Sequence, residues 1–155
     1  MDGGAMGLTW DSHLDAGFCM EMGEQLAVIP VGANILMKSN GQQGNVYRNV
    51  QTAEHLRRLG CVTARDLLVQ GVLHPTTGVV DLLVMIHYPK RSHADPPNLW
   101  PTVKHLEDGM TDAGLWTDDD STHIRRHIFQ HHPNPTGVKG LWRFEFHIIP
   151  IGEDQ

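Results

Sequence analysis

The most constraining feature of this sequence is a nearly continuous apolar run, GVVDLLVMIHY, at residues 78–88. The run is rich in β-branched and large aliphatic residues, and its only acidic residue is Asp81. A strand that is apolar at almost every position must be covered on both of its faces. Residues 78–88 are therefore predicted to form a central β-strand, around which the other elements assemble in layers.

The chain before and after this strand alternates between strand and helix patterns. A strand pattern at 25–31 precedes apolar residues at helical spacing over 52–70, which predict a helix. Gly60 and the β-branched pair Val62-Thr63 are a candidate break within this helix. After the central strand, Asn98 is suited to cap a second helix over 99–113. The sequence therefore predicts two main helices, one on each side of the central strand along the chain.

Two further strand patterns, 122–130 and 141–151, are separated by a turn-rich loop and predict a long hairpin. The complete order is strand, helix, strand, helix, strand, strand. This order predicts a single compact α+β domain with a mixed β-sheet over residues 24–155. Residues 1–23 show weak periodicity and are predicted to form an N-terminal extension or arm.

Composition limits the classes of partner. The 155 residues are 40% hydrophobic, which suits one globular core, and no run approaches the roughly 18 apolar residues of a membrane span. The N-terminus lacks the basic and apolar regions of a signal peptide, and Cys19 and Cys61 form no CxxC pair. We therefore expect a cytoplasmic protein with free thiols and no membrane partner. The formal net charge of −6 counts against nucleic-acid binding unless basic side chains gather locally.

Acidic residues are concentrated around the second helix, at Asp95, at Asp108 and in the run 118–120. Carboxylate oxygens are the ligands that Mg²⁺ prefers, and Lys104 is placed one helical turn from Asp108. A helix of 15 residues is about 22 Å long, so its two ends meet only through a folded-back chain or a second subunit. The alternative interpretation is a solvated turn at the end of the helix with a simple Lys104–Asp108 ion pair.

Histidines offer a second kind of site. In a strand, His123, His127 and His131 would project from one face, where zinc binding is conceivable. Their i,i+4 spacing suits a helix better than a strand, and no cysteine completes a recognisable zinc signature. The other interpretation of these side chains is a polar or DNA-facing strand surface.

Residues 95–120, DPPNLWPTVKHLEDGMTDAGLWTDDD, resemble the signature of RusA-type Holliday junction resolvases. That signature is Asp-x-Asp-Asn-x-x-Lys-x-x-x-Asp, followed by Ala-Gly, an aromatic or aliphatic residue and Trp, and then x-Asp-Asp. Lys104 and Asp108 match its lysine and helix aspartate, and residues 113–119 match the remainder without a gap. Weaker similarity extends over about residues 24–152.

The sequence departs from this family pattern in two places. Three extra residues separate Asn98 from Lys104, a form that resembles phage-borne members, and Pro97 stands where the family has its second aspartate. The resemblance therefore carries over Asp95 and Asp119 as the best metal ligands. Asp118 and Asp108 are the candidate substitutes for the missing carboxylate.

The resemblance implies a RusA-like dimeric fold and an endodeoxyribonuclease that resolves four-way DNA junctions by paired nicks in recombination and repair. It implies Mg²⁺, with Mn²⁺ as a possible replacement, and a homodimer in a bacterial cytoplasm, encoded by a phage or prophage. Asp95, Lys104 and Asp119 would be catalytic, with Lys104 stabilising negative charge. Asn98 would cap the helix and orient Asp95.

Six basic residues are the candidate phosphate contacts to branched DNA. Two alternative functions remain open. Pro97 and the acidic net charge favour a protein that binds branched DNA without cleaving it, and the histidines favour, less strongly, a His-rich zinc-binding protein. The six basic candidates are Lys90, Arg91, Arg125, Arg126, Lys139 and Arg143.

Overall fold

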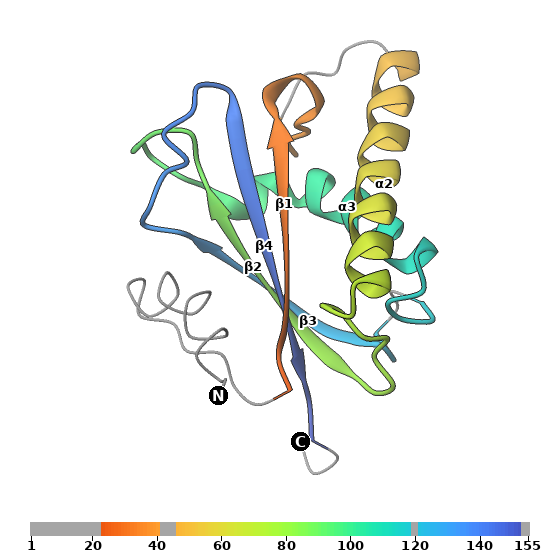
Figure 1. Ribbon diagram of the computed structural model, residues 1–155. Coiled ribbons are helices and arrows are strands. Elements are labelled where there is room, and N and C mark those ends of the chain that lie inside the picture. The colour runs from red at the N-terminus through yellow and green to blue at the C-terminus, as the bar shows by residue number, and fades with distance from the viewer. Residues whose placement is uncertain (1–22, 41–45, 119–120, 153–155) are drawn as a thin grey trace.

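The computed structural model describes residues 23–40, 46–118 and 121–152 (Figure 1). Within these residues the chain forms a single α+β domain with a four-stranded mixed sheet and two α-helices, which confirms the predicted fold class. The predicted arm, residues 1–23, lies almost entirely outside the described part of the chain. The elements are β1 Gln25–Gly32, the 3₁₀ turn η1 Ala33–Ile35, α2 Val46–Val69, β2 Val80–His87, the 3₁₀ turn η2 Pro96–Leu99, α3 Trp100–Asp112, β3 Ile124–His131 and β4 Leu141–Pro150.

The predicted central strand is confirmed, because every residue of β2 is buried. Its side chains alternate between the two faces of the sheet. Val80, Leu82, Val84 and Ile86 join the main hydrophobic core with residues of α2 and α3. The alternate positions of β2 face the other side of the sheet, and they carry Asp81, Leu83, Met85 and His87.

The predicted hairpin is wrong. The strand order is β1-β4-β2-β3, so β4 lies between β1 and β2 and pairs with both in antiparallel fashion, while β3 pairs in parallel with β2. The physical reason is burial: five consecutive residues of β4 are buried, whereas β3 is largely exposed. An apolar strand gains more from a central place, and a polar strand is tolerated at an edge.

Helix α2 is continuous from Val46 to Val69, so Gly60 does not interrupt it. Gly60 instead faces α3. A Cβ at Gly60 would overlap the carbonyl oxygen of Leu106, and a Cβ at Gly109 would overlap the carbonyl oxygen of Arg57. The two helices therefore cross backbone to backbone at a pair of glycines, and Figure 1 shows α2 and α3 side by side.

The start of α3 is held by the segment that follows β1. Pro96–Leu99 forms a 3₁₀ turn with prolines in its first positions. The Oδ1 of Asn98 accepts a hydrogen bond from the backbone N–H of Asn40 at 2.9 Å, and no side chain caps either η2 or α3. Thr102 adds two hydrogen bonds to the backbone of Met37, both 2.8 Å. Asn98 thus joins two segments and does not cap the helix.

Neither α-helix in the described part of the chain combines the length and the apolar character that a membrane span requires.

Replacing Gly109 with Ala is expected to lower the free energy of unfolding by about 1–3 kcal/mol, because the added methyl group forces the two helix backbones apart. Alanine would otherwise favour a helix over glycine. Gly78→Ala is the matched control, since a Cβ there meets no atom within 4 Å. Urea denaturation of the three proteins measures the difference, and equal stability of the Gly109 and Gly78 variants would contradict the close crossing.

Candidate functional site

Asp95 lies in the loop that follows the central strand, directly before η2. Its carbonyl oxygen accepts the backbone N–H of Asn98 at 2.9 Å, and its side chain is exposed. Tyr88 is its neighbour: burial raises the pKa of the Tyr88 phenol, a hydrogen bond from the Asp95 backbone lowers it, and the Asp95 charge raises it. Asp95 is therefore at the end of the sheet where β2 finishes.

Lys104 and Asp108 form the predicted ion pair on α3, with Lys104 Nζ donating to Asp108 Oδ1 at 2.7 Å. Both side chains are partly exposed, and His105 Nδ1 is 3.9 Å from the second Asp108 oxygen. Burial lowers the pKa of the His105 imidazole, and the nearby Asp108 carboxylate raises it. The pair is accessible to a ligand, but it is already a complete i,i+4 contact.

Asp118 lies at the opposite end of the sheet from Asp95. The carbonyl oxygen of Leu115, three residues earlier, accepts the N–H of Thr76 in the segment that leads into β2. Between the two aspartates, α3 has 13 residues and a length of about 20 Å. One chain does not bring Asp95 and Asp118 together. Asp119, the preferred sequence candidate, is outside the described residues.

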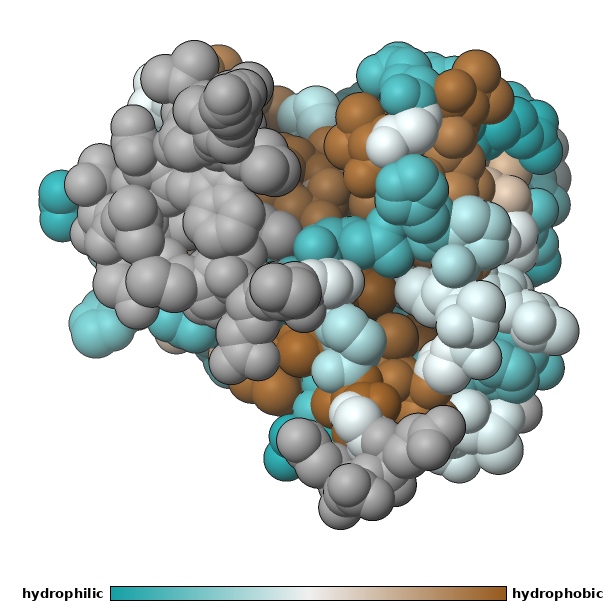
Figure 2. Space-filling model, turned by 60° about the horizontal axis from the view of Figure 1, so that its bottom comes forward, coloured by the Kyte–Doolittle hydropathy of each residue, from teal (hydrophilic) through white to brown (hydrophobic). Residues whose placement is uncertain are grey.

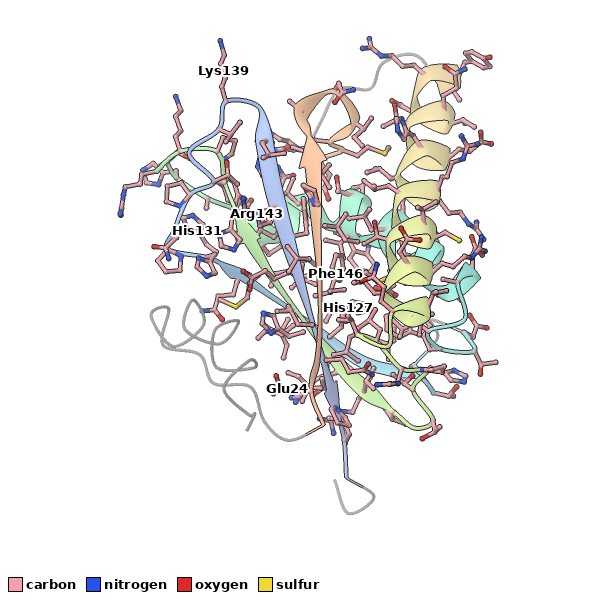
Figure 3. All side chains as sticks on the ribbon, viewed as in Figure 1. Glu24, His127, His131, Lys139, Arg143 and Phe146 are labelled. Carbon is pink, nitrogen blue, oxygen red and sulfur yellow. The ribbon has the colours of Figure 1, made fainter. Side chains whose placement is uncertain are left out.

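The structure separates the six basic candidates into two groups. Lys90 and Arg91 follow β2, and two backbone hydrogen bonds join their loop to the loop between β3 and β4. Lys139 lies at the tip of that second loop, with Arg143 on the adjoining part of β4 (Figure 3). These four residues are at the same end of the sheet as Asp95.

The other two basic candidates, Arg125 and Arg126, are bound to a buried carboxylate. Asp81, 3% exposed, accepts two hydrogen bonds from each arginine, at 2.6 to 3.1 Å. A register shift between Val80 and Asp81 lets two successive residues of β3 turn to one partner. The Arg125 guanidinium lowers the pKa of the Asp81 carboxyl, and burial raises it less. Both exposed arginines therefore compensate the buried charge of Asp81.

The histidines predicted to share one face do not form a metal site among the described residues. The Nε2 of His127 is 2.7 Å from Glu107 Oε2, in a contact between β3 and α3. His131 packs edge-on against Tyr88, and Figure 3 shows it at a different level of the sheet from His127.

A different group of ligand atoms converges on the sheet face that carries Asp81. His87, His132 and Glu145 place their nitrogen and oxygen atoms within 4.8 Å of one another, and all three side chains are buried. This is the one such group in the described part of the chain, and it could hold a metal ion. Three separate segments supply it: the end of β2, the residue after β3, and the middle of β4.

Sequence reasoning missed this group because its members are 13 to 58 residues apart and no spacing rule joins them. The available signal was alternation in β4, where Arg143, Glu145 and His147 alternate with Phe144 and Phe146. Charged and imidazole side chains on the second face of a central strand require partners there.

A hollow of about 410 Å³ lies where β2 begins. Figure 2 turns this end of the molecule towards the viewer and shows hydrophobic and hydrophilic side chains interleaved on it. Among the described residues, the hollow is lined by glycine, proline, threonine, glutamine and aliphatic side chains, and none of these carries a carboxylate, imidazole or thiol. It lacks the groups that acid–base or metal chemistry needs.

No family model and no curated protein matches this chain.

Replacing Asp81 with Asn is expected to lower the free energy of unfolding by about 2 kcal/mol at pH 7, because charge-assisted hydrogen bonds are lost. The folded carboxyl has a lowered pKa, so its contribution is complete well above pH 3.8 and disappears as the pH falls through the folded value. The difference between wild type and variant should therefore be constant from pH 6 to 8 and shrink below about pH 4.

Thermal unfolding across this pH range measures the effect. Asp66→Asn, on the exposed surface of α2, is the control for loss of one negative charge. A wild-type advantage over Asp81→Asn that persists unchanged at pH 2 would contradict the role assigned to Asp81.

Proposed function

We propose that this protein is a Mg²⁺-dependent, structure-selective endodeoxyribonuclease of RusA type, which resolves four-way DNA junctions by paired nicks. The resemblance of residues 95–120 to that family suggested the activity, and Mn²⁺ is a candidate replacement for Mg²⁺. The proposed setting is the cytoplasm of a bacterial host, with a phage or prophage gene. The observation that carries the proposal is the position of Asp95 at the same end of the sheet as four basic residues.

That arrangement is suited to a phosphodiester. Lys90, Arg91, Lys139 and Arg143 provide positive charge for phosphates, while the chain as a whole has a net charge of −6. A net charge of −6 counts against nucleic-acid binding only if basic side chains are dispersed, and here four of them gather at one end of the sheet. Asp95 provides carboxylate oxygens beside them, which are suitable ligands for Mg²⁺.

The proposed site is completed by a second subunit. Mg²⁺ binds oxygen at 2.0–2.1 Å, so two ligands of one ion lie within about 4 Å of each other. Asp95 and Asp118 flank a helix of about 20 Å, which excludes one ion held by both in a single chain. A twofold axis perpendicular to β2 would place the Asp95 end of one protomer beside the Asp118 end of its partner. The same axis would create two equivalent sites in the dimer. Two such sites fit paired nicks.

Each residue has a defined task in this proposal. Asp95, with Asp118 or Asp119 of the other protomer, would hold the ion, which on binding supplies an activated water and neutralises phosphate charge. Lys104 would donate to a non-bridging phosphate oxygen, and Asp108 orients its ammonium group at 2.7 Å. Asn98 fixes the backbone of Asp95 through its own N–H.

A second function is favoured by one observation, which is that Pro97 replaces the second aspartate of the family pattern. With one carboxylate fewer, the protein would bind branched DNA without cleaving it. A synthetic four-way junction and a linear duplex of the same length, each with and without Mg²⁺ or Mn²⁺, separate the two functions. Paired nicks in the junction alone support the nuclease, whereas selective binding without nicks supports the second function.

For the nuclease, Asp95→Asn is expected to reduce junction nicking at least about 100-fold while leaving junction binding intact, because one metal ligand is lost. Asp66→Asn is the matched control, since it removes an exposed carboxylate elsewhere. Gel assays of nicking and binding measure both properties. Full nicking by Asp95→Asn would exclude Asp95 from the site.

The shared site predicts complementation between inactive chains. Asp95→Asn and Asp118→Asn/Asp119→Asn are co-expressed with different tags, and heterodimers are isolated by using both tags in turn. Each heterodimer contains one site with all of its aspartates, so it should make single nicks at about half of the wild-type rate. Inactive heterodimers beside an active wild type would refute the shared site and leave the nuclease activity standing.

The basic residues near Asp95 predict a difference in salt dependence. Lys90→Gln/Arg91→Gln should weaken junction binding and reduce the slope of log affinity against log salt by about 2. Arg126→Gln is the matched control, because Asp81 already binds that arginine. Equal slopes for the two variants, measured by fluorescence anisotropy at several salt concentrations, would contradict this placement of the DNA.

A further inference from the structure

The buried group on the second face of the sheet is separate from the acidic residues around α3. His87 ends β2, His132 directly follows β3, and Glu145 lies in β4. Their exposed fractions are 6%, 1% and 5%. Titratable side chains buried to this extent need compensation for the water that they have lost.

The proton on His87 is fixed by its neighbour Asn134. The Nδ1 of His87 is 2.7 Å from the carbonyl oxygen of Asn134, which only accepts hydrogen bonds, so Nδ1 carries the proton. The other nitrogen, Nε2, is 2.5 Å from Glu145 Oε2, a separation at which a cation, either a proton or a metal ion, lies between the two atoms.

His132 also places its Nε2 near Glu145 Oε2. The rings of His87 and His132 are stacked, with centroids 3.7 Å apart, and His132 Nε2 is 3.9 Å from Glu145 Oε2. The other Glu145 oxygen, Oε1, is 3.0 Å from Nε2 of His147. One carboxylate oxygen thus faces two imidazoles, while a third imidazole holds the other oxygen.

We propose that His87 Nε2, His132 Nε2 and Glu145 Oε2 bind one Zn²⁺ ion, which ties the ends of β2 and β3 to β4. Two imidazoles and a carboxylate form a recognised donor set for zinc, with water in the fourth position. The donor set does not suit Mg²⁺, which prefers oxygen ligands in an octahedron. His147 is a positioning residue, because it holds Glu145 and does not itself bind the ion.

Zinc binding would change the separations of the ligand atoms little, but the stacked His87 and His132 rings would also have to tilt so that each lone pair points at the ion. Zn²⁺ bonds of about 2.0–2.1 Å in a tetrahedron set ligand atoms about 3.3 Å apart. The observed separations of 2.5 and 3.9 Å lie on either side of this value, so His87 moves outward and His132 inward, each by less than about 1 Å.

Binding also changes the tautomer of His132. At present the backbone N–H of Asn134 donates to His132 Nδ1 at 3.0 Å, so a neutral ring carries its proton on Nε2. With zinc on Nε2, the single ring proton would move to Nδ1, so the ring would stay neutral and the hydrogen bond from Asn134 to Nδ1 would be lost. The backbone of His132 is held in place, because its N–H donates to the carbonyl of Ile86 at 3.0 Å.

The test begins with elemental analysis of protein purified without a histidine tag. We expect about one zinc per chain, and removal by a chelator should lower the melting temperature until Zn²⁺ is restored. Co²⁺ added to the stripped protein should give the visible absorption of a four-coordinate site. Absence of bound metal, together with no response of the stripped protein to Zn²⁺ or Co²⁺, would overturn the site and leave a shared proton as the bridging cation. One equivalent of another metal would overturn the assignment of zinc.

Variants locate the ion. Zinc affinity, measured by competition with a chromogenic chelator, should fall by about 10–100-fold in His147→Ala and further in His132→Ala. His55→Ala, exposed on α2, is the histidine control, and Asp95→Asn tests independence from the acidic residues. Both should retain wild-type affinity. A folded His132→Ala protein with wild-type affinity would place the ion elsewhere.

If His132→Ala does not fold, wild-type protein provides an independent measurement. The backbone amide signal of Asn134 in a ¹H–¹⁵N spectrum should shift when Zn²⁺ is added to stripped protein, because its hydrogen bond to His132 is broken. An unchanged Asn134 signal at saturating Zn²⁺ would exclude His132 Nε2 as a ligand.

Discussion

The rest of the structure depends on the backbone contact between α2 and α3. Gly60 and Gly109 have no side chains to keep the helices apart. Each glycine therefore lies against a carbonyl oxygen of the other helix. This contact presses α3 onto the sheet, where Leu106 and Met110 enter the core. Because η2 directly precedes α3, the place of the Asp95 loop is also set by two residues that have no side chain.

The sequence predicted what depends on local pattern. β1, β2, α3 and the last two strands lie within a few residues of their predicted bounds, because period-2 and period-3.6 burial are visible along the chain. Strand neighbours were not predictable in the same way. β3 and β4 are adjacent in sequence, and their separation by β2 depends on which strand buries more apolar surface.

The same contrast applies to the candidate sites: contacts between residues close in sequence were predictable, and contacts that depend on strand placement were not. Lys104 and Asp108 meet as predicted, because four residues on a helix determine their distance. The ligands His87, His132 and Glu145 meet only after three strands have been placed in register. For Arg125 and Arg126, the sequence predicted phosphate contacts but not their hydrogen bonds to the buried Asp81, which depend on the register shift beside that residue.

The insertion of β4 also orders the events of folding. β1 pairs with β4 alone, across a register that joins Gln25 to Ile148, whereas β2, α3 and β3 form a contiguous parallel crossover unit. During synthesis, β1 and the apolar face of α2 emerge long before the strand that connects them to the sheet. The apolar surfaces of β1 and α2 are therefore covered only after β4 has been made, and contacts of such high sequence separation slow folding.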